Sequence, residues 1–138
     1  MRSALRPDGV APPGGHYSHG VIVETARTLY VAGQVALDQD GQLVGPGDAE
    51  AQARQVLSNL QRVIEAAGGR LEDVAKTTVL LTDLDHRQPV DRVRREFFRG
   101  DPPANTLLVV ASLARPEFLV EIEAVVPLGR TRPLTPQD

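Results

Sequence analysis

Short apolar runs typical of strands alternate along this chain with two longer stretches that have helical spacing. Between Asp48 and Gly68, apolar residues recur every three or four positions, which is the period of one face of an α-helix. Asp48 is a favourable N-cap, and Gly68 with Gly69 forms a typical C-terminal stop. The side chains that we expect to face the core are Ala53, Val56, Leu57, Leu60, Val63, Ile64 and Ala67.

A second helical pattern begins near Pro89, which fits the first turn of a helix because no N–H is needed there. We expect Gly100 to end this helix. Its predicted apolar stripe consists of Val90, Val93, Phe97 and Phe98. Three arginines share the helix and are expected to form a solvated face, namely Arg92, Arg94 and Arg95.

The strand-like runs complete the predicted order β-β-α-β-α-β-β. They cover 18–24, 28–35, 74–82, 105–111 and 119–126, and the first two should form a hairpin. Strand–helix–strand units of this kind predict one α+β domain, a mixed sheet with both helices on one face. We place this domain at residues 15–128, between a flexible N-terminal arm at 1–14 and a C-terminal tail at 129–138.

Two of the predicted strands, 74–82 and 105–111, carry apolar residues at consecutive positions and therefore on both faces. A strand that is apolar on both sides is normally covered on both sides. Two helices cover only one face, so the pattern favours a homo-oligomer packed sheet against sheet. The alternative, an N-terminal arm folded back over the open face, stays open.

Composition narrows the possible functions. The 138 residues include no cysteine, which excludes disulfides and cysteine-based metal sites or nucleophiles. The net charge of −3 argues against nucleic-acid binding. No apolar run approaches the length of a membrane span, and the first fifteen residues lack the apolar segment of a signal peptide. We therefore expect a cytoplasmic protein that does not associate with a membrane.

Few residues are candidates for chemistry. Glu121 and Glu123 lie on one face of the last strand, where a desolvated carboxylate beside a like charge suits proton transfer. Two solvated surface carboxylates explain the same pattern equally well. His16 and His19 flank Tyr17, but no acidic cluster stands at ligand spacing, so no metal site is predicted and the histidines receive no role.

Asn105 stands at the entrance to a buried strand, in the stretch DPPANTLLVV at 101–110. The double proline forces an extended entry, and the apolar run that follows places the amide at the edge of the core. A polar side chain there needs a partner. It either satisfies backbone groups at the start of the strand or binds a ligand.

Several blocks together strongly resemble the Rid (YjgF-like) family of reactive-intermediate deaminases, also called endoribonuclease L-PSP. The blocks are G-x-Y-S-x-G-V at 15–21, LYVAGQVALD at 29–38, AEAQARQVLSNLQRVIEAAGGRLEDVAKTTVLLTDL at 49–84, FF-x-G-x-PPA at 97–104 and VEIEAVV at 120–126. The resemblance implies a chorismate-mutase-like α+β fold. It also implies a homotrimer with an internal β-barrel and small-molecule clefts between subunits.

In active deaminases of the family, a glutamate in the final strand positions the water that hydrolyses a 2-imino or 2-enamino acid, and an arginine after PPA holds its carboxylate. The resemblance maps that glutamate onto Glu121 and a cleft tyrosine onto Tyr17. It places Ala32 where many members have serine, and Asn105 where they have the arginine. The remaining ligand-binding positions that we expect are Gly33 and Thr106.

Asparagine at position 105 departs from the deaminase pattern. It lacks the cationic fork that grips a carboxylate, a loss of roughly 1.5–3 kcal/mol or tenfold to more than a hundredfold in affinity. We therefore expect altered specificity, with a neutral or differently shaped ligand. Hydrolysis of a C=N bond needs no metal or organic cofactor. The alternatives are a non-catalytic metabolite-binding or chaperone-like trimer and, with the acidic charge against it, an endoribonuclease.

Overall fold

The structure, a computed structural model, describes residues 2–129. The predicted C-terminal tail, apart from Gly129, lies outside the described residues. In chain order, the elements are β1 (Arg2–Leu5), β2 (Gly20–Val23), β3 (Arg27–Gln34), α1 (Ala49–Ala66), the short 3₁₀ turn η1 (Leu71–Asp73), β4 (Lys76–Leu81), the 3₁₀ turn η2 (Leu84–His86), α2 (Arg87–Phe97), β5 (Ala104–Val109) and β6 (Val120–Leu128).

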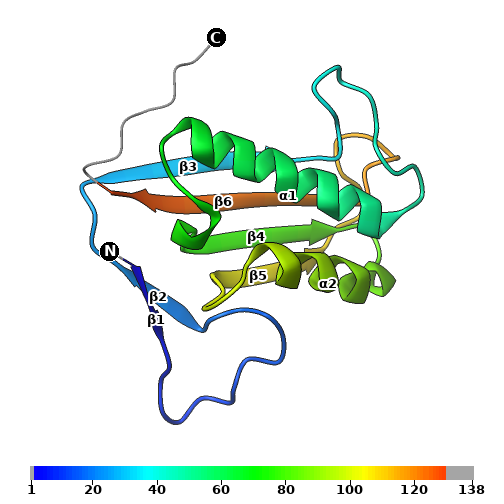
Figure 1. The fold of residues 1–138 in the computed structure, drawn as a ribbon. Helices are drawn as coiled ribbons and strands as arrows, with labels where there is room; N and C mark the ends of the chain where they lie inside the picture. The colour runs from blue at the N-terminus through cyan, green and yellow to red at the C-terminus, as the bar shows by residue number, and fades with distance from the viewer. Residues whose placement is uncertain (1, 130–138) are drawn as a thin grey trace.

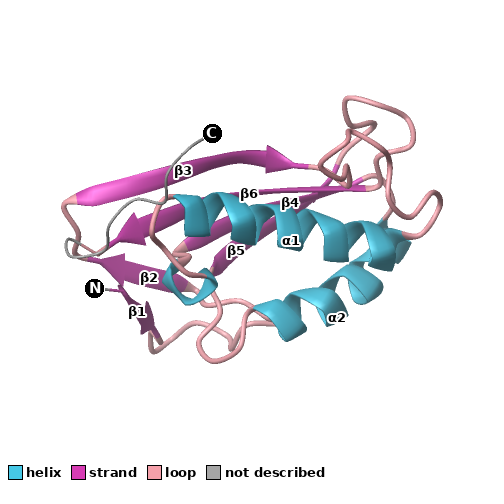
Figure 2. Cartoon of the chain, turned by 45° about the horizontal axis from the view of Figure 1, so that its top comes forward, coloured by secondary structure: helices cyan, strands magenta, loops and turns pink. Residues whose placement is uncertain are grey.

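Four strands form the main sheet in the order β3-β6-β4-β5. β4 and β5 run parallel, and β6 is antiparallel to both β3 and β4, so the sheet is mixed. Both helices lie on the same face of this sheet (Figures 1 and 2). The predicted α+β architecture with two helices on one face is therefore confirmed.

Helix α1 covers the sheet through an apolar stripe with helical spacing. Asp48 caps it as predicted, with its Oδ1 accepting a hydrogen bond from the Ala51 N–H at 3.0 Å. The stripe includes one polar residue, the fully buried Gln52, which the pattern of apolar positions did not indicate. Val63, predicted to face the core, is instead 36% exposed because it lies beside the buried row that ends at Ile64.

The predicted hairpin between residues 18–24 and 28–35 is wrong. β2 pairs with β1, a strand inside the predicted flexible arm, and β3 pairs with β6. Pairing with β6 places β3 in the main sheet, where Val31 joins the core beneath α1. In its pairing with β1, β2 leaves Ile22 54% exposed. The arm is held near the main sheet by Arg2, whose Nε donates to the carbonyl oxygen of Val74 at 2.6 Å.

The second face of the main sheet carries no helix. Along β6, buried residues alternate with Glu121, Glu123 and Val125, which belong to this open face. Tyr30 on β3 is 76% exposed and Leu108 on β5 is 49% exposed. The described part of the arm therefore does not cover the open face. β1 and β2 form a separate two-stranded sheet (Figure 1).

Among residues 2–129, neither helix combines the length and the apolar character that a bilayer crossing requires.

Candidate functional site

Tyr17 and Asn105 line one pocket, although they are 88 positions apart in the sequence. Ser18 brings their segments together, since it pairs with Ala104 in an isolated parallel bridge. The Ser18 N–H donates to the carbonyl oxygen of Pro103 at 3.0 Å. The pocket lies between this N-terminal segment and helix α2 and has a volume of about 740 Å³. It is the first of two places where candidate site residues gather.

Asn105 finds its structural partner on the neighbouring strand. The parallel register of β4 and β5 sets it beside Thr77, on the face covered by the helices. The Thr77 hydroxyl donates to Asn105 Oδ1 at 2.8 Å. Asn105 Nδ2 has no hydrogen-bond partner within residues 2–129, so the pocket wall offers an N–H donor.

Arg94 closes the inner side of this pocket, and the prediction that it belongs to a solvated face is wrong. Its side chain is only 4% exposed, whereas those of Arg92 and Arg95 are 60% and 56% exposed. Arg94 Nη2 donates to the Thr77 hydroxyl at 3.5 Å, and Nη1 donates to the carbonyl oxygen of His16 at 3.1 Å.

The guanidinium of Arg94 is incompletely satisfied. Its Nε is buried and has no hydrogen-bond partner among the described residues. Burial lowers the pKa of Arg94, and the carboxylate of Asp91, 3.3 Å from Nη1, opposes that shift. The sequence contained one sign of this burial: Arg94 follows Val90 by four positions and so lies next to the apolar stripe of α2.

The second group of candidates lies on the open face around Glu121. A Cβ at Gly33 would lie 2.7 Å from Glu121 Cδ, so the carboxyl group is packed directly over this glycine. The pairing of β3 with β6 is interrupted between Val31 and Gln34, which leaves Ala32 and Gly33 outside the regular ladder. Glu121 is half-buried, and its carboxylate has no hydrogen bond or ion pair within residues 2–129.

Thr106 belongs to the same open face, where Lys76 Nζ donates to its hydroxyl at 2.6 Å. Glu123 is also there and is exposed. One chain therefore holds the predicted site residues in two groups. Tyr17 and Asn105 lie beside α2, whereas the others, Ala32, Gly33, Thr106 and Glu121, lie on the open face. Asn105 and Glu121 do not meet within one chain, because the register places them on opposite faces of the sheet.

Comparison with known proteins identifies the family. The sequence model described as endoribonuclease L-PSP matches residues 9–127. The chain belongs to the endoribonuclease L-PSP (Rid) family. A Rid-family protein from Yersinia pestis, YyfB, is 35% identical over 92% of this chain and 98% of its own, with a TM-score of 0.86. RidA from the Antarctic bacterium Psychrobacter is 32% identical, covering 91% of this chain and 99% of its own, with a TM-score of 0.70.

The two histidines that flank Tyr17 in this Rid-family chain have different roles: His16 links the N-terminal segment to the end of α2, whereas His19 bonds within that segment. His16 Nε2 donates to the carbonyl oxygen of Phe98 at 2.7 Å, and His19 Nε2 donates to that of Ala11 at 2.6 Å. Within the part of the chain that the structure describes, no three histidine or acidic side chains come together in a manner suited to a metal ion. The ring of His19 also contacts that of Tyr17 edge to face, with 5.8 Å between the ring centroids.

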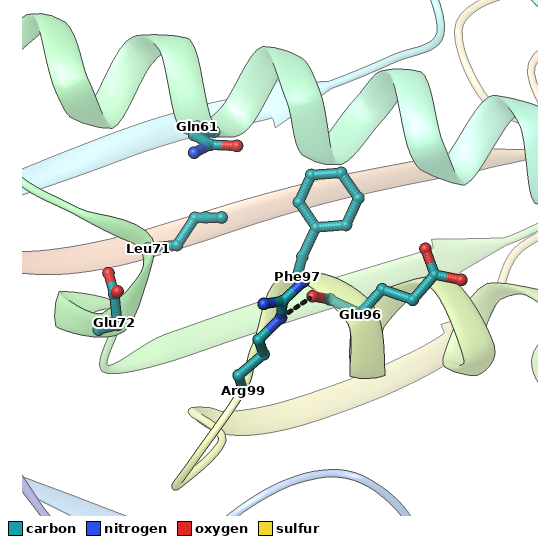
Figure 3. A pocket seen from close by; sticks show the side chains of 6 residues that line it. All are labelled: Gln61, Leu71, Glu72, Glu96, Phe97 and Arg99. Carbon is teal, nitrogen blue, oxygen red and sulfur yellow. Dashed lines mark hydrogen bonds between the residues drawn. The ribbon is translucent and has the colours of Figure 1, made fainter.

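Another hollow in this Rid-family fold lies between α1, η1 and the end of α2 (Figure 3). Its volume is about 390 Å³, and its lining residues are Gln61, Leu71, Glu72, Glu96, Phe97 and Arg99. Arg99 is held in place by a 3.1 Å hydrogen bond from its Nε to the carbonyl oxygen of Glu96 (Figure 3). None of the residues selected from the sequence lies here, so the pocket beside α2 and the open face remain the candidate site.

Proposed function

We propose that this Rid-family protein hydrolyses a small imine or enamine at clefts between the subunits of a homotrimer, with Glu121 as the catalytic residue. Membership of the family supports a small-molecule deaminase or endoribonuclease-like role. The observation that carries the proposal is the position of Glu121, whose carboxylate is half-buried over Gly33 and unpaired among the described residues. Such a carboxylate is able to accept a proton from water.

The proposed reaction needs only acid–base chemistry. Glu121 accepts a proton as water adds to the C=N carbon, which gives a carbinolamine. Glu121 first returns that proton to the nitrogen, so the carbinolamine is neutral. It then takes the hydroxyl proton of the carbinolamine and passes it to the nitrogen as the C–N bond breaks, so that ammonia leaves and a carbonyl compound remains. An enamine enters this sequence after it tautomerises to the imine. No metal or organic cofactor takes part.

The separation of the two residue groups supports an assembly of several chains. The exposed Tyr30 and Leu108 give the open face an apolar character that favours burial. In the proposed trimer, three open faces form an internal β-barrel. The pocket of one subunit, at the edge strand β5, then meets Glu121 of the next. Asn105 in place of the arginine alters the specificity of this shared cleft.

The test of this function is an imine-trapping assay. An amino-acid oxidase generates imines in the presence of semicarbazide, and hydrolysis by the protein reduces the trapped product. We expect Glu121→Gln to reduce that activity by about a hundredfold or more, since proton transfer by a placed group typically contributes 10²–10⁴-fold. Glu123→Gln is the matched control, because it removes an exposed carboxylate from the same face of β6. Equal activity of the Glu121→Gln and unaltered proteins would contradict the proposal.

A non-catalytic metabolite-binding trimer is the second candidate, favoured by the placement of Asn105 and Glu121 on opposite faces within one chain. This candidate predicts ligand binding without turnover of any imine in the same assay. RNA cleavage has less support, because the chain carries a net charge of −3. An RNase activity that Glu121→Gln removes would favour cleavage over both.

A further inference from the structure

The pocket beside α2 contains more positive than negative charge. The arginines that line it are Arg87, Arg92, Arg94 and Arg95. Asp91 supplies the carboxylate in this lining, and Arg92 Nη2 also lies 3.9 Å from Glu50 Oε2 outside it. The Asp91 carboxylate forms ion pairs with two of these arginines. Its Oδ1 lies 3.3 Å from Arg94 Nη1, and its Oδ2 lies 3.1 Å from Arg95 Nε. A hollow lined in this way by guanidinium groups has a positive potential that attracts anions.

Arg87 is available to a ligand. It is the first residue of α2 and exposed. Its backbone N–H donates to the carbonyl oxygen of Leu84, but its guanidinium has no ion pair or hydrogen bond within residues 2–129. Its Nη2 lies 3.8 Å from the position that a Cβ on Gly15 would take, so the guanidinium extends over the turn that leads to Tyr17. This free guanidinium offers the planar, paired N–H donors that suit a carboxylate or phosphate.

Arg94 acts on the same pocket through Asn105. The hydrogen bonds run from Arg94 Nη2 to the Thr77 hydroxyl and from that hydroxyl to Asn105 Oδ1. Because Thr77 receives a hydrogen bond from Arg94, its own proton is directed to Asn105, and the amide is oriented with Nδ2 as the unused donor. A buried cation thus fixes an N–H group at the pocket wall.

We propose that this pocket binds the anionic group of a small molecule, with Arg87 contacting the anion directly and Asn105 Nδ2 donating to it. Arg94 and Thr77 are positioning residues in this arrangement. This inference rests on the proposed function, because the anion would bind in the same site. It replaces the expectation of a neutral ligand, because the cation lost at position 105 is supplied by α2. The chemistry fits a carboxylate or a phosphate.

The test measures binding rather than turnover. Pyruvate, methyl pyruvate and inorganic phosphate are titrated into the full-length protein at low ionic strength and followed by NMR. We expect pyruvate to bind at least about tenfold more tightly than its neutral ester, the effect of one charge-assisted hydrogen bond. Arg87→Ala should remove this preference and Arg87→Lys should retain part of it. Arg62→Ala, which removes an exposed arginine from α1, should leave the preference intact.

The outcomes separate this inference from the proposed function. Pyruvate binding that depends on Arg87, without hydrolysis of any imine, supports the anion site and overturns the proposed reaction. Arg87-dependent binding of phosphate but not of pyruvate supports an anion site for phosphate compounds. Equal binding of pyruvate and its ester without Arg87-dependent binding of phosphate, or an Arg87→Ala protein that keeps the preference, overturns the anion site even if imines are hydrolysed.

Discussion

At the scale of single residues, Gly33 shows how a missing side chain makes room for a carboxylate, that of Glu121. The carboxyl carbon of Glu121 lies 2.7 Å from the position that a Cβ at residue 33 would occupy, closer than a real Cβ contact allows. Any other residue at position 33 would therefore displace the carboxylate. The requirement for glycine here concerns space, because no left-handed backbone angle is involved.

Gly33→Ala should consequently impair function more than folding. The atoms that the new methyl group meets belong to the flexible end of Glu121, which is able to move aside. We expect imine hydrolysis to fall by about tenfold or more, since a displaced acid–base group loses much of its 10²–10⁴-fold effect. Thermal unfolding monitored by circular dichroism should change little.

The control for Gly33→Ala is Gly129→Ala, because no atom lies within 4 Å of the position where a Cβ at Gly129 would stand. This variant should keep both activity and melting temperature. A Gly33→Ala protein with full activity would mean that the position of the Glu121 carboxylate does not matter for the reaction.

The sequence indicated which polar residues needed explanation, but not their partners. Asn105 stood out because it precedes an apolar run after two prolines. Its partner Thr77 lies on another strand, and the link depends on the parallel register of β4 and β5. The sequence pattern also did not predict the burial of Arg94, because a helix of mixed charge normally exposes its arginines. Both facts depend on long-range packing.

At the scale of elements, local signals were sufficient to predict both helices and the three strands β4, β5 and β6 to within about two residues. The cap at Asp48 and the glycines that follow α1 act on adjacent residues. Strand pairing is different, because it joins distant segments. The partner of Gly20–Val23 is Arg2–Leu5, in a stretch without periodicity that was predicted to be a flexible arm. The hairpin was predicted incorrectly because local sequence patterns do not identify the partner of a strand.

Gln52 links α1 to two loops, and its loss should destabilise the fold. Its Nε2 donates to the carbonyl oxygens of Gly45 and Glu117 at 3.1 and 3.0 Å, and its Oε1 accepts from the Leu119 N–H at 2.9 Å. Leucine fills a similar volume but leaves these buried groups without partners. We expect Gln52→Leu to lower the free energy of unfolding by about 3 kcal/mol, measured by urea denaturation.

Gln61→Leu is the control for this change on the same helix. Within residues 2–129, the side chain of Gln61 donates only to the side chain of Glu65, one turn along α1, at 3.0 Å. The free energy of unfolding should therefore change by about 0.5 kcal/mol or less. Similar losses in the two variants would show that the links from Gln52 to the loops contribute little.

At the scale of the whole molecule, the uncovered sheet face decides whether the two groups of site residues work together. Strand patterns apolar on both sides predicted that two helices would leave a face open, and the structure shows this face. The sequence did not reveal that Asn105 and Glu121 lie on opposite sides of one sheet. A shift of the strand pairing by one residue moves each side chain to the other face, and local patterns do not determine that pairing. The proposed site, which combines the two groups, would therefore require a second chain.

The proposed trimer should have a mass three times the 14.9 kDa of one chain in size-exclusion chromatography with light scattering. Leu108 tests the interface, since it lies in one row with Leu80 and Glu121 on the open face and is 49% exposed. Leu108→Glu places charges where three copies would meet, so we expect smaller species and at least a tenfold loss of imine hydrolysis. Val63→Glu adds the same charge at an exposed apolar position on α1 and should keep both mass and activity. An active monomer would contradict the shared cleft. Glu121 and Asn105 lie on opposite faces of one chain, so they come together only if two chains associate.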